Sequence, residues 1–263
     1  MNTYNPLQLR EIFHLEFLRW LGRKIKAQNY CLKGGVNLRF FFGSFRYSED
    51  MDLDISGVRA SILKEVVMKI LGAPSFQDNI NPFGIERIVP PDISKAKQTE
   101  TTQRFKVHLI TVSGEDLFTK IEFSRRGFSA GIIVQPVSEV ILRAYKIPPL
   151  LVPHYEVREA IAQKIGALAT RNITQARDIF DLYVLTSQYN DLQREITIPA
   201  NLVISKLTKA HENIFGIGFG QFRDTVLSYL TPEDNDVYNK PSVWDEIKLK
   251  VSNFIEELKK KYA

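Results

Sequence analysis

The sequence predicts an α+β protein, in which a small mixed sheet with helices is followed by a mainly helical C-terminal part. Two patterns predict this class: polar and apolar residues alternate over several short segments before residue 147, and helical spacing dominates beyond Pro153. The length of 263 residues also matters, because single cores usually stop growing at about 250–300 residues. We therefore predict two domains, residues 1–147 and 148–263.

The composition is that of an ordinary globular chain, with 44% apolar and 25% charged residues. The formal charge of +5 is compatible with a phosphate or RNA ligand, but it is weak support alone. Cys31 is the only cysteine, which excludes an internal disulfide and a Cys-rich zinc site and favours the cytoplasm. Charged residues interrupt residues 1–30, and no apolar run approaches the ~18 residues of a membrane span, so we expect neither a secretion signal nor a span.

Helices are expected at three places in the first domain. Asn5-Pro6 is typical of a helix start, and the apolar residues that follow have helical spacing. Shorter helices are expected at residues 36–42, after Gly34-Gly35, and at residues 60–71. The proline-containing stretch 74–103 is predicted to be mostly loop, with a short strand at 85–89.

Strands are expected where residues alternate with period two. Residues 51–55 alternate apolar and acidic side chains, as a half-buried strand does. Residues 104–112 and 118–124 also alternate, and the turn residues 113–116 between them predict an antiparallel hairpin.

Asp50, Asp52 and Asp54 leave one face of the first predicted strand, while the residues between them enter the core. Such a row repels itself in water, and a divalent cation over it would explain it, because carboxylate oxygens suit magnesium and paired metals clamp phosphoryl transfer. A solvated strand edge is the simpler alternative. An EF-hand is excluded, because Ile55 and Ser61 stand where that loop needs Gly and Glu.

Two further segments are candidates for the same site. Lys33-Gly34-Gly35 precedes a short helix, so its backbone amides can bind a phosphate, with Arg46 and Ser48 in the following loop as additional contacts. Glu122 shares a strand face with Lys120 and is the candidate third carboxylate, which either completes a metal cage or acts as a base. Asp116, in the turn, is the weaker rival.

Several motifs lie at characteristic spacing over roughly residues 30–185. They are Leu32-Lys33-Gly34-Gly35, Leu38-Arg39, Gly43, Arg46, Ser48-Glu49-Asp50-Met51-Asp52-Leu53, residues 159–168, Arg171, Ala176-Arg177-Asp178 and Asp181-Leu182. With these motifs the chain resembles the AbiEii-like nucleotidyltransferases, the toxin halves of bacterial toxin–antitoxin pairs linked to abortive phage infection.

This resemblance implies a polymerase-β-like nucleotidyltransferase core that uses two metals, magnesium or manganese, to transfer a nucleoside monophosphate from an NTP. Asp50 and Asp52 match the family's paired metal ligands, although the general pattern of the fold fits Asp52 and Asp54 equally well. Lys164 and Asp178 match the Lys and Asp of its downstream motifs, and an NTP-binding Lys164 would place the site between the two domains. Considered on its own residues, Lys164 flanks an apolar helix stripe, and Asp181 is compatible with a structural ion cluster.

Three functions are compatible with these residues. The first is transfer of NMP to an RNA 3′ end, most readily tRNA, favoured by the resemblance and by five basic residues on the predicted hairpin: Arg104, Lys106, Lys120, Arg125 and Arg126. The second is transfer to a small-molecule or protein hydroxyl. The third is an inactive relative that binds nucleotide or its antitoxin, against which the intact acid row argues.

Overall fold

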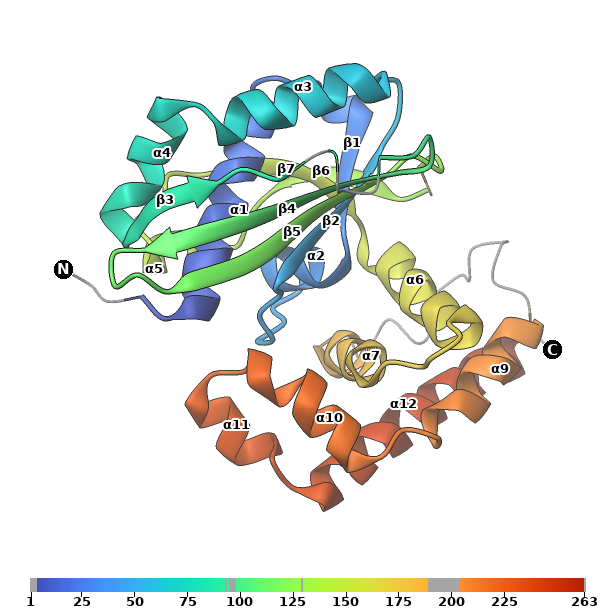
Figure 1. Ribbon diagram of the computed structural model, residues 1–263. Coiled ribbons are helices and arrows are strands. Elements are labelled where there is room, and N and C mark those ends of the chain that lie inside the picture. The colour runs from blue at the N-terminus through green and yellow to red at the C-terminus, as the bar shows by residue number, and fades with distance from the viewer. Residues whose placement is uncertain (1–3, 93, 95–97, 129, 189–203, 263) are drawn as a thin grey trace. The chain divides into compact units, whose positions relative to one another are not determined.

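The computed structural model describes residues 4–92, 94, 98–128, 130–188 and 204–262, and the chain forms two compact units (Figure 1). The N-terminal unit runs to Tyr155 but lacks the segment Phe42–Arg46, which belongs to the C-terminal unit together with the chain after Glu156. The predicted domain boundary at residue 147 stays a prediction. The α+β class, with a mixed sheet followed by helices, is confirmed.

A seven-stranded mixed sheet forms the centre of the N-terminal unit, in the order β3-β4-β5-β2-β1-β7-β6 within the described residues. Its strands are β1 (Tyr30–Lys33), β2 (Asp50–Ile55), β3 (Ile85–Val89), β4 (Thr102–Thr111), β5 (Asp116–Ser124), β6 (Ile132–Pro136) and β7 (Leu151–Tyr155). β2 pairs in parallel with β5, and β1 pairs in parallel with β7, whereas the other neighbours are antiparallel. The predicted hairpin, β4 and β5, is confirmed.

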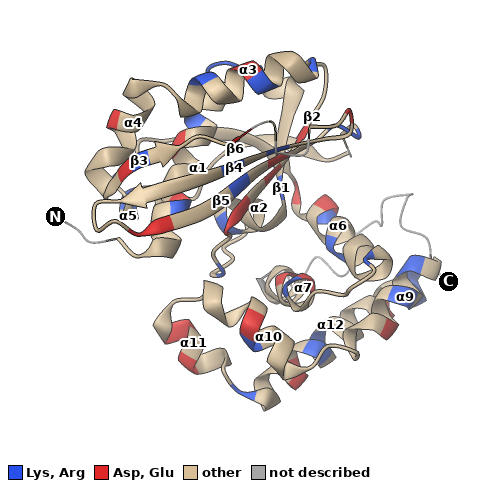
Figure 2. Ribbon diagram, in the orientation of Figure 1, with Lys and Arg blue, Asp and Glu red and all other residues tan. Residues whose placement is uncertain are grey.

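One face of this sheet is apolar and covered by helices. Met51, Leu53 and Ile55 of β2 are almost fully buried, as the alternation predicts. They pack into the same core as α1 (Pro6–Gly22), α3 (Ala60–Leu71) and α4 (Pro74–Ile80), which lie together in Figure 1. The opposite face of β2 and β5 therefore carries the acidic and basic side chains. Figure 2 colours the acidic and basic positions along the ribbon.

The helix α1 begins as its sequence predicts. The Asn5 side chain accepts a hydrogen bond from the Gln8 backbone at 3.0 Å, and the Gln8 side chain accepts one from the Asn5 backbone at 3.0 Å. This capping box satisfies two N–H groups that a helix end otherwise leaves without partners. The helix also buries three polar residues, Glu11, His14 and Glu16, among its apolar ones.

The C-terminal unit consists of helices within the described residues: α6 (Val157–Thr170), α7 (Ala176–Gln188), α9 (Ile204–Ile214), α10 (Phe219–Thr225), α11 (Pro232–Tyr238) and α12 (Pro241–Tyr262). Helix α9 packs against α6 and α12, and α7 packs against the same two helices. Trp244 is fully buried, stacks on Phe222 and donates its indole N–H to the Ile217 carbonyl at 3.0 Å. None of the described helices is long and apolar enough to cross a membrane.

Two expectations about this fold were wrong. Residues 74–80 form α4 instead of a loop, because Pro74 occupies the first turn, where proline is tolerated, and Phe76 and Ile80 bury one helix face. Strands β6 and β7 were not expected at all; β7 contains Pro153, which weakens the signal of a strand. The strand at residues 85–89 is confirmed.

Candidate active site

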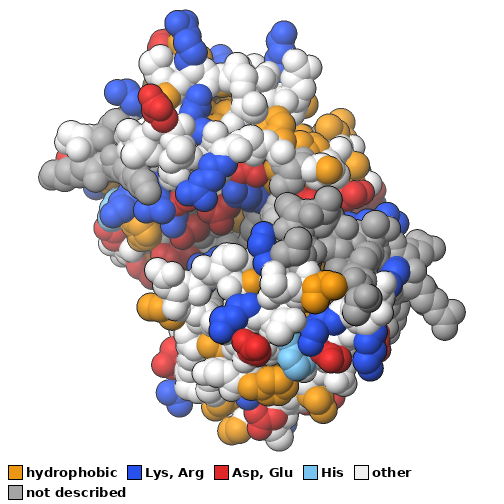
Figure 3. Space-filling model, turned by 90° about the vertical axis from the view of Figure 1, so that its right-hand side faces the viewer, with side chains coloured by type: hydrophobic (Ala, Val, Ile, Leu, Met, Phe, Trp, Pro, Cys, Tyr) orange, Lys and Arg blue, Asp and Glu red, His pale blue; other side chains and the backbone are white. Residues whose placement is uncertain are grey.

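Three carboxylates meet on the polar face of β2 and β5. The parallel register sets Asp52 opposite Glu122 and Asp50 opposite Lys120. Glu122 is thus placed beside the acid row, whereas its rival Asp116 lies near the hairpin turn, opposite Ile110, and pairs with His108 at 2.9 Å. Figure 3 shows acidic side chains gathered beside Lys and Arg side chains on one face of the molecule. This neighbourhood is the candidate active site.

Asp54 has a different environment from the other two acids of β2. The residue is 6% exposed, and its carboxylate accepts a hydrogen bond from the Tyr155 hydroxyl at 2.6 Å and pairs with the Lys33 ammonium at 2.5 Å. A carboxylate with both oxygens used in this way is already compensated. These contacts leave Asp54 less available to a metal ion than Asp50 and Asp52. Asp54 instead orients the Lys33 side chain.

Gly34 joins β1 directly to α2 (Gly34–Phe41) and lies against Asp52. Its φ of +69° is in the left-handed region, and a Cβ there would come within 2.8 Å of Asp52 Oδ2. Only glycine meets both demands without strain. The backbone at the start of α2 thus lies directly beside the acid row, as expected if it binds a phosphate there.

The outer carboxylates are held by basic side chains. Lys120 lies 2.8 Å from Asp50 Oδ2 and 4.0 Å from Glu122 Oε2, and the Arg104 guanidinium donates to that same Glu122 oxygen at 2.5 Å. Ser48 donates its hydroxyl to the Asp50 carbonyl at 2.8 Å, so it contacts the backbone of the acid row. Lys120 was noted from the sequence only as a basic neighbour, and its position between two acids follows from the register.

Asp52 is the least compensated of the acids. Burial raises the pKa of its carboxyl, repulsion from Glu122 raises it further, and Lys120 and Lys33 offset part of the effect. Lys120 and Lys33 act on the Asp52 carboxylate only through space. Among the described residues, this carboxylate forms no hydrogen bond and no ion pair. The fold therefore places this carboxyl where its charged form is unfavourable.

The carboxylates of the site have oxygen donors of the type that a divalent cation binds, but they do not form a ready metal cage. No group of three His, Cys, Asp or Glu side chains within the described residues already has a metal-binding arrangement, and Lys120 lies between two of the acids. However, Asp50 Oδ1 is buried and has no hydrogen-bond partner, and Asp52 lies next to it on the strand face. Oxygen atoms that lack a donor while bearing negative charge are the ligands that magnesium and manganese bind.

The downstream motif residues form a second cluster, buried inside the C-terminal unit. Lys164 of α6 pairs with Asp178 at 3.0 Å and Asp181 at 2.6 Å on α7, and Arg171 pairs with Asp178 at 3.1 Å. Arg46 holds Asp181 through two bonds, Nε to Oδ1 at 3.0 Å and Nη2 to Oδ2 at 3.1 Å.

The charges of this cluster stabilise one another. Burial opposes the charged form of Asp181, but Arg46 and Lys164 outweigh it and lower the pKa of this carboxyl. Burial likewise disfavours the Lys164 ammonium, and Asp181 and Asp178 more than reverse this and raise its pKa. Arg46, predicted as a phosphate contact, gives its guanidinium fork to Asp181, and the ion cluster considered for Asp181 is present.

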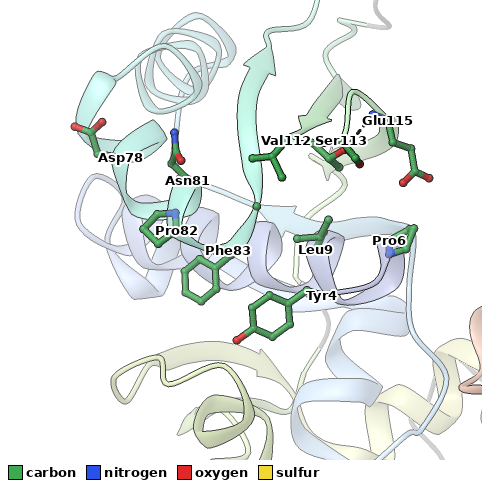
Figure 4. Close-up of a pocket in the computed structure, with 12 residues that line it drawn as sticks. Tyr4, Pro6, Leu9, Asp78, Asn81, Pro82, Phe83, Val112, Ser113 and Glu115 are labelled. Atoms are coloured by element: carbon green, nitrogen blue, oxygen red, sulfur yellow. Dashed lines mark hydrogen bonds between the residues drawn. The ribbon is translucent and has the colours of Figure 1, made fainter. Parts of the chain in front are cut away.

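A separate cavity of about 670 Å³ lies in the N-terminal unit (Figure 4). It is bordered by the start of α1, the end of α4 and the β4–β5 turn, with Tyr4 and Phe83 as its aromatic walls. No predicted site residue is among the described residues that line it. The cavity therefore adds nothing to the acid row.

The N-terminal unit is thus a mixed sheet that presents two aspartates beside a glycine turn, with a further carboxylate on the neighbouring strand. A family model described as "Nucleotidyl transferase AbiEii toxin, Type IV TA system" matches residues 16–250, so the chain belongs to this family of toxin–antitoxin nucleotidyltransferases. A cognate antitoxin follows from that membership.

Solved structures share the fold. JHP933 from Helicobacter pylori matches with a TM-score of 0.56 and 19% identity over 99% of this chain and 95% of its own. MenT4, a nucleotidyltransferase toxin from Mycobacterium tuberculosis H37Rv, matches with a TM-score of 0.62 and 15% identity over 98% of this chain and 87% of its own. A search of curated protein sequences returned no match. At these identities the structural matches establish the fold alone.

The Gly34→Ala variant should lose activity because its Cβ collides with the Asp52 carboxylate and its backbone angle is strained. We expect a lower melting temperature together with a loss of nucleotidyl transfer. Gly166→Ala is the matched control, because nothing lies within 4 Å of its Cβ in α6 and alanine favours a helix by roughly 0.5–1 kcal/mol. Wild-type activity in Gly34→Ala would contradict the contact.

The metal-free Asp52→Asn variant should be more stable than the wild type at neutral pH. A carboxyl whose pKa is raised by folding destabilises the fold above that pKa, and the amide removes this charge. Thermal melts in EDTA should show a rise of about 2–4 °C for each kcal/mol of relieved repulsion. The exposed Asp116→Asn serves as control, and a melting temperature for Asp52→Asn below the wild type would contradict the account.

The Lys164→Ala variant should destabilise the protein by about 3–5 kcal/mol, because it leaves Asp178 and Asp181 buried with one cation fewer. Urea unfolding measures this cost. Lys209, whose side chain is 58% exposed, is the control in the same unit, and its alanine variant should cost under about 0.5 kcal/mol. Equal, small effects would show that the cluster does not brace the helices.

Proposed function

We propose that the protein is a metal-dependent enzyme that transfers a nucleoside monophosphate from an NTP to the 3′ end of an RNA, with tRNA as the acceptor. The observation that carries this proposal is the pair Asp50 and Asp52 beside the Gly34 turn: one buried oxygen of Asp50 has no hydrogen-bond partner, and burial disfavours the charged form of Asp52. Family membership supports the reaction class. Magnesium is the proposed metal, manganese the alternative, and the cytoplasm the proposed location.

Asp50 and Asp52 are the proposed metal ligands, with Glu122 as the third carboxylate. A bound metal would neutralise charge on the phosphates and help to orient the attacking oxygen. Both basic contacts of Glu122 go to Oε2. Its Oε1 is without such contacts among the described residues, which suits either metal ligation or acceptance of a proton from the acceptor hydroxyl.

The residues around the acids are proposed to bind the triphosphate. The backbone amides of Gly34 and Gly35 offer hydrogen bonds to phosphate oxygens, and Lys33, oriented by Asp54, offers a positive charge. The acceptor oxygen then forms a bond to the α-phosphorus, while the bond from that phosphorus to the bridging oxygen breaks and pyrophosphate leaves. The hydroxyl proton passes to a carboxylate or to water.

Lys164 and Asp178 are proposed to act in catalysis as well as in stability, following the family motif. A single substitution cannot separate the catalytic role from the stabilising role, because it leaves a buried charge without its partner. The pair Lys164→Met with Asp178→Asn removes one cation and one anion together, which keeps the cluster's net charge unchanged. Loss of transfer in a stable double variant supports the catalytic role, whereas normal transfer limits the cluster to structure.

The basic residues of the hairpin support an RNA acceptor, although they are not equivalent. Arg104 is engaged with Glu122, and Arg125 contacts the Gln103 side chain and the Val58 carbonyl. Lys106 is exposed, lies opposite Lys120 on the same strand face, and has no ion-pair partner within the described part of the chain. Lys106 is therefore the cation best placed to bind an RNA phosphate.

The Lys106→Gln variant should bind tRNA more weakly while its KM for NTP stays unchanged. One lost phosphate contact should reduce the log–log salt slope of RNA binding by about 0.7–0.9. Lys64→Gln is the control, because Lys64 is also exposed but lies on α3, which covers the other sheet face. An unchanged salt slope in Lys106→Gln would remove this residue from the RNA site.

The reaction itself is tested with each labelled NTP and purified tRNA, before and after periodate oxidation of the 3′ hydroxyl. We expect incorporation with intact tRNA, none with oxidised tRNA, and none with Asp50→Asn. Label that persists on oxidised tRNA, or that enters protein or small molecules, would overturn the acceptor while leaving nucleotidyl transfer in place. No transfer from any NTP in magnesium or manganese would overturn the enzyme proposal.

A further inference from the structure

A buried hydrogen-bond chain connects α1 to the first residues of the acid strand. The Thr119 hydroxyl of β5 lies 2.6 Å from the Glu49 carbonyl, immediately before Asp50, and His14 Nε2 of α1 lies 3.0 Å from the Thr119 oxygen. Thr119 is 0% and His14 1% exposed. Neither residue belongs to the motifs of the acid row.

The direction of these bonds follows from the chemistry of the groups. A carbonyl only accepts, so Thr119 donates its single hydroxyl hydrogen to Glu49. The Thr119 oxygen must then accept from His14, which places a hydrogen on Nε2 of the imidazole. Burial lowers the pKa of His14 to about 3, with repulsion from Arg10 adding to the effect, so the ring is neutral and is a single-hydrogen donor.

From this chain we infer that Thr119 and His14 are positioning residues, which fix the start of β2 against β5 and thereby hold Asp50 and Asp52 in place. Thr119 is the chain neighbour of Lys120, whose ammonium pairs with Asp50, so one short stretch of β5 fixes both the backbone and the side chain there. Asp50 Oδ1 has no hydrogen-bond partner, so its direction depends on the backbone and on the Lys120 contact to the other carboxylate oxygen. The inference rests on the proposed role of Asp50 and Asp52 as metal ligands.

A purely stabilising role is less consistent with the placement of these groups. His14 occupies the apolar side of α1, where a leucine would bury more apolar surface without a polar group to satisfy. A chain of buried hydrogen bonds specifies one arrangement of its groups at a cost in stability. Metal sites depend on such indirect contacts, which orient the residues that bind the metal. The hydrogen-bond chain ends at Glu49, the residue before Asp50. A shift of β2 at this point would directly move the first acid of the row.

The test compares Thr119→Val, which keeps the shape and removes the hydroxyl, with Thr119→Ser, which keeps the hydroxyl. The measured quantity is the Kd for Mn²⁺ alone, by electron paramagnetic resonance, at a temperature well below every melting point. We expect Thr119→Val to raise the Kd about 10–100-fold, as indirect contacts to metal ligands do, and Thr119→Ser to stay near the wild type. His14→Leu should resemble Thr119→Val.

Ser252→Ala provides the matched control, because Ser252 contacts His211 at 2.8 Å through the same hydroxyl–imidazole pairing in the C-terminal unit. It should change the melting temperature without changing the Mn²⁺ Kd. A wild-type Kd in Thr119→Val, whatever its melting temperature, would overturn the positioning role. Unchanged Mn²⁺ binding in Asp52→Asn, or no Mn²⁺ binding by the wild type, would instead overturn the proposed metal site, and the inference with it.

Discussion

The carboxylates of β2 and β5 repel one another, and the arrangement of charged side chains in the N-terminal unit depends on this repulsion. Asp52 lies opposite Glu122 and next to Asp50 on the same face, at a place where burial already disfavours charge. The fold compensates these acids unequally: Lys120 and Arg104 hold the outer two, whereas Asp52 is left with an unfavourable charge. A divalent cation bound at this position, as we propose, would relieve that cost.

The two charge clusters of the protein illustrate opposite uses of buried ions. In the C-terminal unit, Asp181 has a guanidinium fork and an ammonium, so the charges stabilise one another and hold α6, α7 and the Phe42–Arg46 segment together. In the N-terminal unit, the acids outnumber their partners and one buried oxygen of Asp50 has none. In the C-terminal cluster each acid has at least two cations, although Asp178 Oδ2 is buried with an ion-pair contact to Arg171 and no hydrogen bond. The two clusters therefore differ in the number of cations for each acid.

The acid row could be predicted from sequence because strand periodicity is local. Alternation alone places Met51 and Leu53 in the core and Asp50 and Asp52 on the other face, and the structure has this arrangement. The strand β7 and the pairing of Tyr155 with Asp54 were missed, because a proline inside the strand hides its periodicity and a contact between residues so far apart leaves no local signal. The contact between His14 and Thr119 also leaves no local signal. From sequence alone, these residues are an ordinary helix position and an ordinary strand position.

Because β2 pairs in parallel with β5, the acid site can form only at a late point during synthesis of the N-terminal unit. Parallel neighbours cannot be joined by a tight turn, so the chain passes through α3, α4, β3 and β4 before β5 arrives beside β2. Closing such a long loop costs entropy that only the completed sheet offsets. A nascent chain that ends before Ser124 therefore lacks a formed acid site, and Tyr155 reaches Asp54 later still. The three carboxylates therefore come together only after β5 has been made.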